Sequence, residues 1–170
     1  MGIDPGLRVT GYGVIFQQNQ SARYIASGII KTSNDEGNLA SRIKIILSGL
    51  TQVIEQFQPE VVAIEKVFVN TNPQSTLLLG QARGAAIAAA VLKDLDVFEY
   101  TALQIKKSVV GKGHATKNQV QVMIQRLLNL PSIPSTDSAD ALACGICHAN
   151  ISSSLSNFGV GNRMKGGRII

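Results

Sequence analysis

The chain is poor in the features that mark membrane, secreted and disordered proteins. Its 170 residues contain no apolar run of transmembrane length, and the N-terminus lacks the basic-then-apolar layout of a signal peptide. Charged residues make up only 16% of the chain and hydrophobic ones reach 45%, which excludes a disordered chain and is enough to fill a core. We therefore expect one compact domain of ordinary size, located in the cytoplasm.

Cysteine is scarce as well, and both thiols fall in one short segment. Cys144 and Cys147, followed by His148, have the spacing of a c-type haem attachment site and of a redox pair. Haem attachment needs export, and the chain shows no signal peptide. A redox pair lies at the start of a helix, whereas these cysteines lie about two turns into a predicted helix. A zinc site would need two more ligands, and the chain has only one other histidine, His114. Buried structural thiols are the favoured interpretation.

Five segments have the composition of β-strands. The first three favour an antiparallel meander, at residues 1–4, 8–16 and 24–31. Residues 60–65 are almost continuously apolar, which suits a strand covered on both faces. Residues 96–100 form a further short strand.

Helices are expected between and after the later strands. Apolar residues recur at three- and four-residue steps from Leu39 to Phe57, which predicts an amphipathic helix that Pro59 ends. The helix predicted at 73–93 has little polar face along residues 77–91, so we expect it to be buried in the core or against a second subunit. Three more helices are predicted, at 102–110, at 116–129 and from about residue 137 onward.

This order of elements predicts an α/β fold, with a mixed five-stranded sheet flanked by helices. From Ser152 onward the chain is rich in Ser, Asn and Gly with scattered bases. We therefore expect residues 1–151 to form the folded domain and residues 152–170 to form a flexible basic tail.

Four acidic residues lie at notable positions, two at the ends of predicted strands and two close together at the start of a predicted helix. Asp4 and Glu65 each end a predicted strand, and a carboxylate at the end of a buried strand is costly unless something pairs with it. Asp137 and Asp140 lie three residues apart at a helix start, so they project from one side of it. If that helix packs across both strand ends, the four carboxylates converge. Taken singly, each acid has a plainer explanation. Asp4 favours a turn and Glu65 could be a surface acid at a strand end. Asp137 could cap the helix, where the dipole also favours Asp140.

Converging carboxylates repel one another and would take up protons unless a divalent cation neutralised them. All-oxygen ligation suits Mg²⁺, with Mn²⁺ as a substitute. Two such ions can stabilise both oxygens of an in-line phosphodiester displacement, one acting on the attacking water and one on the leaving 3′ oxygen. The expected chemistry is phosphodiester hydrolysis without a covalent intermediate.

Basic residues outnumber acidic ones, 16 to 11. Without the four candidate ligands, 7 acids remain (11 − 4), so the rest of the chain carries +9 (16 − 7). The bases gather in two parts of the sequence: Lys106, Lys107, Lys112, Lys117 and Arg126 in the first, and Arg163, Lys165 and Arg168 in the second. Such a surface would attract phosphates, although solvated helix faces would explain the same charges.

Taken together, several segments resemble the RuvC family of Holliday junction resolvases, in the family's order and at its spacing. The segments are Gly2-Ile3-Asp4-Pro5-Gly6 with Arg8–Val14, Ala63–Phe68, Leu79–Gly84, Val109–Gly113 and Asp137–Ala143. The resemblance runs from the first residue to about His148. No single segment would suffice, whereas the combination is highly specific.

The resemblance implies a ribonuclease H-like fold and a homodimer that makes paired nicks in two strands of like polarity at a four-way DNA junction. We take the helix along residues 77–91, with Gln81 and Ala85, as the candidate dimer interface. The family also works with the RuvA–RuvB branch-migration complex. The metal-binding acids of the family fall on the four acids already singled out: Asp4, Glu65, Asp137 and Asp140.

The resemblance also implies contacts with DNA. Phe68 matches an aromatic residue that stacks on an unpaired base at the crossover. Lys106 and Lys117 match bases that contact DNA near the scissile phosphate, and the charge cluster adds Lys107 and Lys112 as candidates.

Three other functions remain open at this point. One is a different nuclease with this fold, such as one that matures ribosomal RNA. Another is a sugar-kinase or actin-like ATPase, although those folds need two such domains and far more chain. The third is a DNA-binding module without catalysis, which would bind junctions with or without Mg²⁺ and leave them intact.

Overall fold

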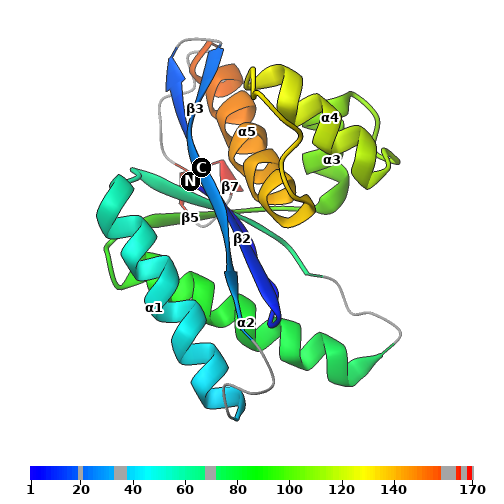
Figure 1. Cartoon of the computed structure of the whole chain (residues 1–170). Helices are drawn as coiled ribbons and strands as arrows, with labels where there is room; N and C mark the ends of the chain where they lie inside the picture. Colours follow the sequence, from blue (N-terminus) through cyan, green and yellow to red (C-terminus); the bar gives the residue numbers. More distant parts are fainter. Residues whose placement is uncertain (19–20, 33–37, 68–71, 158–163, 166–167, 170) are drawn as a thin grey trace.

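The computed structural model describes residues 1–18, 21–32, 38–67, 72–157, 164–165 and 168–169. A five-stranded mixed sheet has helices on both faces (Figure 1), with strand order β3-β2-β1-β4-β5. The mixed sheet flanked by helices that the sequence predicts is therefore confirmed. Within the described residues, no helix is long and apolar enough to cross a membrane.

The short strand β1 (Gly2–Asp4) lies at the centre of the sheet. On one side, β2 (Val9–Gln18) and β3 (Ser21–Lys31) complete the predicted antiparallel meander. On the other, β4 (Val61–Glu65) and β5 (Asp96–Tyr100) run parallel to β1. Because β1 and β4 are parallel neighbours, their acidic last residues emerge at the same edge of the sheet. A second, two-stranded sheet pairs β6 (Met164–Lys165) with β7 (Arg168–Ile169).

Helices α1 (Leu39–Phe57) and α2 (Pro73–Val91) cover one face of the sheet (Figure 1). The side chain of Asn38 caps α1, and Gln58 ends it in a left-handed conformation one residue before Pro59. The two helices and the strands beneath them share an apolar cluster, which we call the α1/α2 cluster. Its members include Ile3, Ile46, Leu50, Val62, Ile64 and Ala86.

Helices α3 (Ala102–Val110), α4 (Lys117–Leu127) and α5 (Thr136–Asn157) lie on the opposite face. Thr101 and Thr116 open α3 and α4 with capping boxes, in which a glutamine three residues later returns the hydrogen bond. A second apolar cluster, the α5 cluster, joins these helices to the sheet. Its members include Ala63, Tyr100, Ile105, Ile124, Leu142 and Cys144.

Glycines allow α5 to rest directly on the backbone of β1 and β2. A Cβ on Gly11 would overlap the main-chain carbonyl of Asp137, and one on Gly2 would overlap that of Ala141. These overlaps are with backbone, which has little room to move aside. The two glycines therefore fix how closely the first turns of α5 approach the strand ends.

One expectation needs correction. The tail predicted from Ser152 begins inside α5, which continues to Asn157. Ile151 packs against the α5 cluster, and the Ser154 hydroxyl donates to the carbonyl oxygen of Asn150 at 2.8 Å, so serines there do not end the helix. Helix α2 was expected to be buried in the core or against a second subunit. Ala82, Ala85 and Ala86 face the core of this chain, while Leu77 is 69% exposed.

We predict that Gly11→Ala lowers the free energy of unfolding by about 3 kcal/mol, because the new methyl group meets the backbone of α5. The matched control is Gly145→Ala, at the same contact between helix and sheet. There a Cβ would sit 3.5 Å from the nitrogen of Gly2, an ordinary contact. Since alanine also favours the helix, this variant should gain about 0.5–1 kcal/mol. Urea unfolding checks both, and equal effects would contradict the close approach.

Candidate active site

Asp4 and Glu65 point toward α5. Side chains alternate between the two faces of a strand, and Ile3 and Ile64 belong to the α1/α2 cluster. The residues that follow them, Asp4 and Glu65, therefore face the opposite side. They are adjacent across the sheet because Ile3 pairs with Ile64 in the parallel ladder. The structure thus places both predicted strand-end acids side by side on the α5 face.

The first turn of α5 brings Asp137 and Asp140 to the same edge. The helix is capped by Ser135, whose hydroxyl oxygen accepts from the backbone N–H of Ser138 at 3.4 Å. Sequence reasoning assigned a capping role to Asp137 as its plainer explanation, and that assignment is wrong. With Ser135 as the cap, Asp137 lies in the first turn of α5, where the helix dipole also favours an acidic residue.

The pKa values of the acids show how strongly they act on one another. Burial raises the pKa of Asp4 most, and with the charges of Asp140, Glu65 and Asp137 it brings the pKa from 3.8 to about 7. Burial also raises the pKa of Glu65, and Asp140 adds to that rise. For Asp140, burial is again the largest cause of a raised pKa, opposed by Lys117 and reinforced by Asp137. The four carboxyl groups therefore form one electrostatic unit.

Two of the predicted lysines border this unit. The ammonium group of Lys117, at the start of α4, lies 3.7 Å from a carboxylate oxygen of Asp140. Lys106, on α3, and Lys117 both lower the pKa of Glu65. The Lys117 side chain is 73% exposed, so it contributes little to stability and can reach a phosphate. Lys107 and Lys112 are exposed, and Phe68 lies outside the described residues.

The donor set suits a divalent cation. It consists of carboxylates that are partly buried and repel one another, so a cation would relieve the cost of ionising them. Among the described residues, no three acidic, cysteine or histidine side chains already stand close enough to enclose an ion. The site therefore fits a metal by the chemistry and charge of its donors, and its carboxylates must draw together to ligate one.

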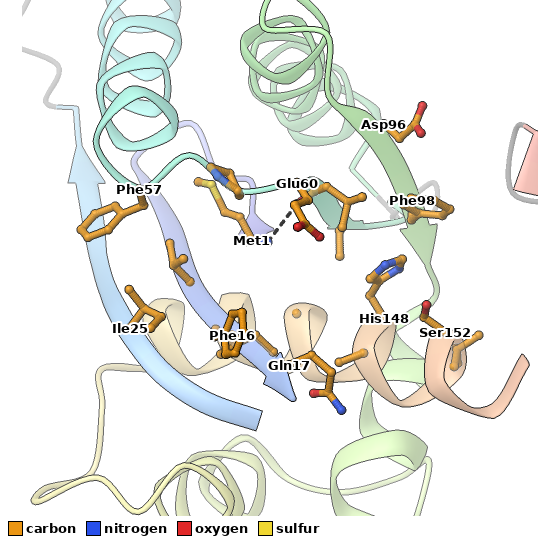
Figure 2. A pocket seen from close by; sticks show the side chains of 18 of the residues that line it. Met1, Phe16, Gln17, Ile25, Phe57, Glu60, Asp96, Phe98, His148 and Ser152 are labelled. Atoms are coloured by element: carbon orange, nitrogen blue, oxygen red, sulfur yellow. Dashed lines mark hydrogen bonds between the residues drawn. The ribbon is translucent and has the colours of Figure 1, made fainter. Parts of the chain in front are cut away.

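The four acids do not line the cavity shown in Figure 2. A cavity of about 1360 Å³ is found at the other end of the sheet, where β4 and β5 begin, and Phe57, Glu60 and Phe98 are among its lining residues (Figure 2). At its wall, the His148 ring packs 4.4 Å from that of Phe98, and its Nδ1 lies 2.8 Å from the hydroxyl of Tyr100. The four acids lie instead at the carboxyl ends of β1 and β4, where each of them is partly exposed.

The cysteine segment has the plain role that the sequence favours. Cys144 and Cys147 are buried in α5 and are free thiols. Burial raises the pKa of Cys147 to about 11, so its thiol stays protonated. The haem and redox interpretations have no support in this placement.

One residue at the site was missed by sequence reasoning. Arg83, on α2, donates from Nε to the main-chain carbonyl oxygen of Glu65 at 3.2 Å and forms an ion pair with Glu99 of β5. It lies 18 residues from Glu65 in the chain. It belongs to the segment Leu79–Gly84 that resembles the family, but no local pattern links it to the end of β4.

Comparisons with known proteins identify the family of this chain. A family model described as crossover junction endodeoxyribonuclease RuvC matches residues 1–148. The crossover junction endodeoxyribonuclease RuvC of Methylobacillus flagellatus is 60% identical, over 100% of this chain and 97% of the relative. The protein of that name from Azoarcus sp. is 58% identical, over 100% of this chain and 92% of the relative.

Solved structures are similar as well. Thermus thermophilus RuvC in complex with a Holliday junction substrate has a TM-score of 0.83 and 32% sequence identity, over 90% of this chain and 93% of that one. The yeast mitochondrial Holliday junction resolvase has a TM-score of 0.68 at 14% identity, over 92% of this chain and 80% of that one, and shows a shared fold alone. The predicted ribonuclease H-like fold is confirmed, and the chain belongs to the RuvC family of crossover junction endodeoxyribonucleases.

Proposed function

We propose that this chain is a Holliday junction resolvase, which makes paired symmetric nicks at four-way DNA junctions during recombination and repair. The observation that carries the proposal is the gathering of Asp4, Glu65, Asp137 and Asp140 from three separate elements at one open edge of the sheet. Family membership and the similarity to a RuvC bound to a Holliday junction substrate support the choice of DNA junctions.

The four carboxylates are the proposed ligands of Mg²⁺, in two-ion form, with Mn²⁺ as a substitute. When bound, the ions would supply the Lewis acidity that phosphodiester hydrolysis needs. The carboxyl groups must lose their protons to act as ligands, and Lys106 and Lys117 favour that loss by lowering the pKa values of Glu65 and Asp140. The same lysines, and more distantly Lys107 and Lys112, would attract the DNA phosphates.

Two further roles are proposed from the resemblance. Phe68 follows β4 by three residues and would stack on an unpaired base at the crossover. The RuvA–RuvB complex would deliver the junction. The nuclease domain, expected over residues 1–151, is proposed to extend to the end of α5 at Asn157. The basic segment after that helix would add affinity for DNA without contributing to the site.

A homodimer would place two such sites on one junction, and α2 carries the surface proposed for its interface. Leu77, Gln81, Gly84 and Val91 are exposed at steps of four, three and seven residues, so they share the outer face of the helix. A Cβ on Gly84 would meet nothing within 4 Å in this chain. Ala85, taken from the sequence as an interface residue, is instead 7% exposed and packs in the α1/α2 cluster.

We predict that the wild-type chain cuts a synthetic mobile four-way DNA junction in Mg²⁺ with paired symmetric nicks. Asp4→Asn should reduce the cutting rate by about 10³-fold and leave junction binding intact, because several kcal/mol of metal-dependent stabilisation are lost. Structured RNA and linear duplex DNA serve as controls for the other nuclease functions. Binding without cutting by the wild type, in either Mg²⁺ or Mn²⁺, would leave only a DNA-binding role.

Repulsion among the acids gives a test that needs no substrate. Because the folded pKa of Asp4 lies above its unfolded value, the stability that protonation confers is present at low pH and is lost as pH rises through about 7. We predict that Asp4→Asn raises Tm at pH 8 in a chelating buffer by on the order of 5 °C. Mg²⁺ should raise the wild-type Tm and change that of the variant far less.

Asp96→Asn is the matched control for this measurement, since Asp96 is an exposed acid where β5 begins, at the far end of the sheet. It should alter neither Tm nor the response to Mg²⁺. If Asp4→Asn behaves as Asp96→Asn does, Asp4 is not part of a metal site.

We predict that Gln81→Arg weakens the homodimer by about 100-fold, because each copy would place an unpaired charge in the two-fold interface. Gln52→Arg makes the same change on an exposed position of α1 and should leave the dimer intact. Sedimentation velocity measures both. An unchanged sedimentation coefficient for Gln81→Arg would remove α2 as the interface.

A further inference from the structure

Arg83 joins α2 to the ends of two neighbouring strands. Its side chain is only 21% exposed, and its Nε donates to the main-chain carbonyl oxygen of Glu65, the last residue of β4, at 3.2 Å. The Nη2 atom of the same guanidinium forms an ion pair with the Glu99 carboxylate on β5. One planar group thus contacts both strands where β4 ends.

Arg83 acts from the face opposite to the four acids. On β5, Phe98 and Tyr100 pack in the α5 cluster, so Glu99 between them points to the α2 side. The carboxylate of Glu65 faces α5, whereas its carbonyl oxygen receives the Arg83 hydrogen bond. Arg83 can therefore hold the backbone of Glu65 without occupying space that a metal ion or DNA would need.

Glu65 is the last residue of β4, so its main chain is held by the ladder only up to the end of the strand. Its carboxylate is partly buried and shares the α5 face of the sheet edge with the other acids, so its position depends on how the end of β4 is held. The sheet holds this strand end on the β5 side, where the N–H of Lys66 donates to the carbonyl oxygen of Tyr100 at 2.7 Å. The guanidinium adds a second restraint, one that comes from a helix rather than from the ladder.

We propose that Arg83 is a positioning residue that sets the affinity of the acidic site for divalent cations by fixing the main chain of Glu65. The inference rests on the proposed function for the identity of the site. It also links α2, the proposed dimer interface, to a metal ligand, because Arg83 lies two residues from Gln81 on the same helix.

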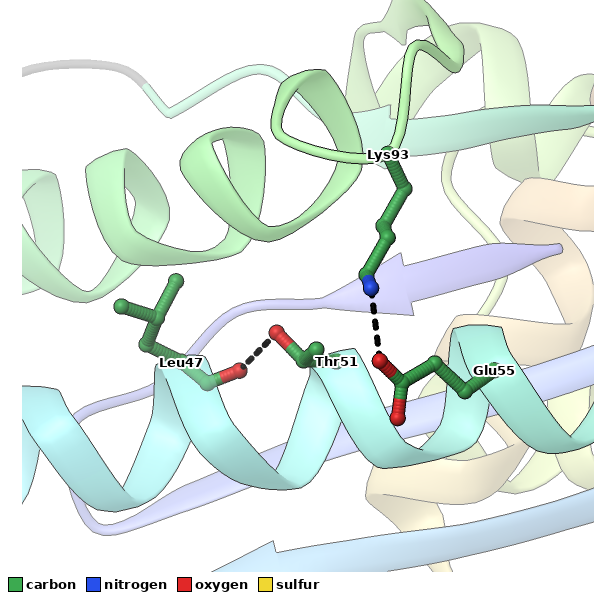
Figure 3. A network of polar contacts seen from close by, with 4 residues as sticks. All are labelled: Leu47, Thr51, Glu55 and Lys93. Carbon is green, nitrogen blue, oxygen red and sulfur yellow. Dashed lines mark hydrogen bonds and ion pairs between the residues drawn. The ribbon is translucent and has the colours of Figure 1, made fainter.

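The variant that tests the role is Arg83→Gln, which removes the charge and the forked donor. Lys93→Gln is its matched control. The ammonium of Lys93, just after α2, pairs with Glu55 of α1 at 2.6 Å, on a part of α1 where Thr51 donates to the carbonyl oxygen of Leu47 (Figure 3). Both substitutions break one ion pair made by the α2 region, but only Arg83 contacts β4.

Two readouts are measured on the full chain: Mn²⁺ binding by titration calorimetry, and the Mg²⁺ concentration that gives half-maximal junction cutting. Arg83→Gln should weaken Mn²⁺ binding and raise the Mg²⁺ requirement, each by about 10-fold, as expected when the support of a metal ligand is lost. Junction affinity in Ca²⁺ should stay within about 2-fold of the wild type, since phosphate contacts set it. Lys93→Gln should change none of these.

Two more variants separate positioning from simple stability. Glu99→Gln keeps the hydrogen bond from Arg83 to Glu65, so it should weaken Mn²⁺ binding much less than Arg83→Gln does. Arg83→Lys keeps the charge but loses the planar fork, so it should restore the metal affinity only in part. If Arg83→Gln lowers Tm while the folded protein binds Mn²⁺ with wild-type affinity, Arg83 is merely structural and the proposal is wrong.

The same measurements distinguish a failure of the proposed resolvase function from a failure of the proposed role of Arg83. A wild-type chain that binds Mn²⁺ but cuts no junction would overturn resolvase activity, while calorimetry would still decide the role of Arg83. A wild-type chain that binds no Mn²⁺ at all would overturn both.

Discussion

The close packing of α5 against the backbone of the central strands is the constraint on which the rest of the structure depends. Glycines on β1 and β2 let the backbone of the helix touch the backbone of the sheet, with Gly11 against Asp137 and Gly2 against Ala141. A side chain at either place would lift the helix from the strand ends. Only at this short separation do acids from the start of α5 meet the acids that end β1 and β4, so the sheet, the helix and the site are one arrangement.

That arrangement works against stability at the site itself. Burial and like charges raise the pKa values of Asp4, Glu65 and Asp140, so the folded chain holds carboxyl groups that ionise with difficulty. Lys117 and Lys106 offset part of this cost, and a divalent cation would offset more. The large apolar clusters on both faces of the sheet make such a local cost tolerable. Strain of this kind is expected where a site must bind a metal and a phosphodiester together.

Much of the architecture could be predicted because it depends on local patterns. The bounds predicted for α1, α3 and β5 are confirmed, and apolar periodicity is what defined α1. The predictions that were wrong concern residues whose role depends on contacts distant in sequence, or on which of several polar residues caps a helix. Ser135 caps α5 in place of Asp137, the serines after Ser152 continue α5 rather than end it, and Ala85 faces its own core. Arg83 reaches Glu65 through the tertiary fold, which no spacing along the chain encodes.

Convergence of the four acids was itself inferred from a family resemblance, since periodicity places residues on faces but does not bring elements together.

The central claim is that α5 and the two strand ends build one carboxylate site for divalent cations. The most direct measurement is a crystal structure of the chain soaked in Mn²⁺, with anomalous scattering used to locate the ion. We expect anomalous density between Asp4, Glu65, Asp137 and Asp140, with the carboxylates drawn toward it and α5 still in contact with Gly11. Saturating Mn²⁺ without density at these four residues, or density only elsewhere in the molecule, would contradict the account.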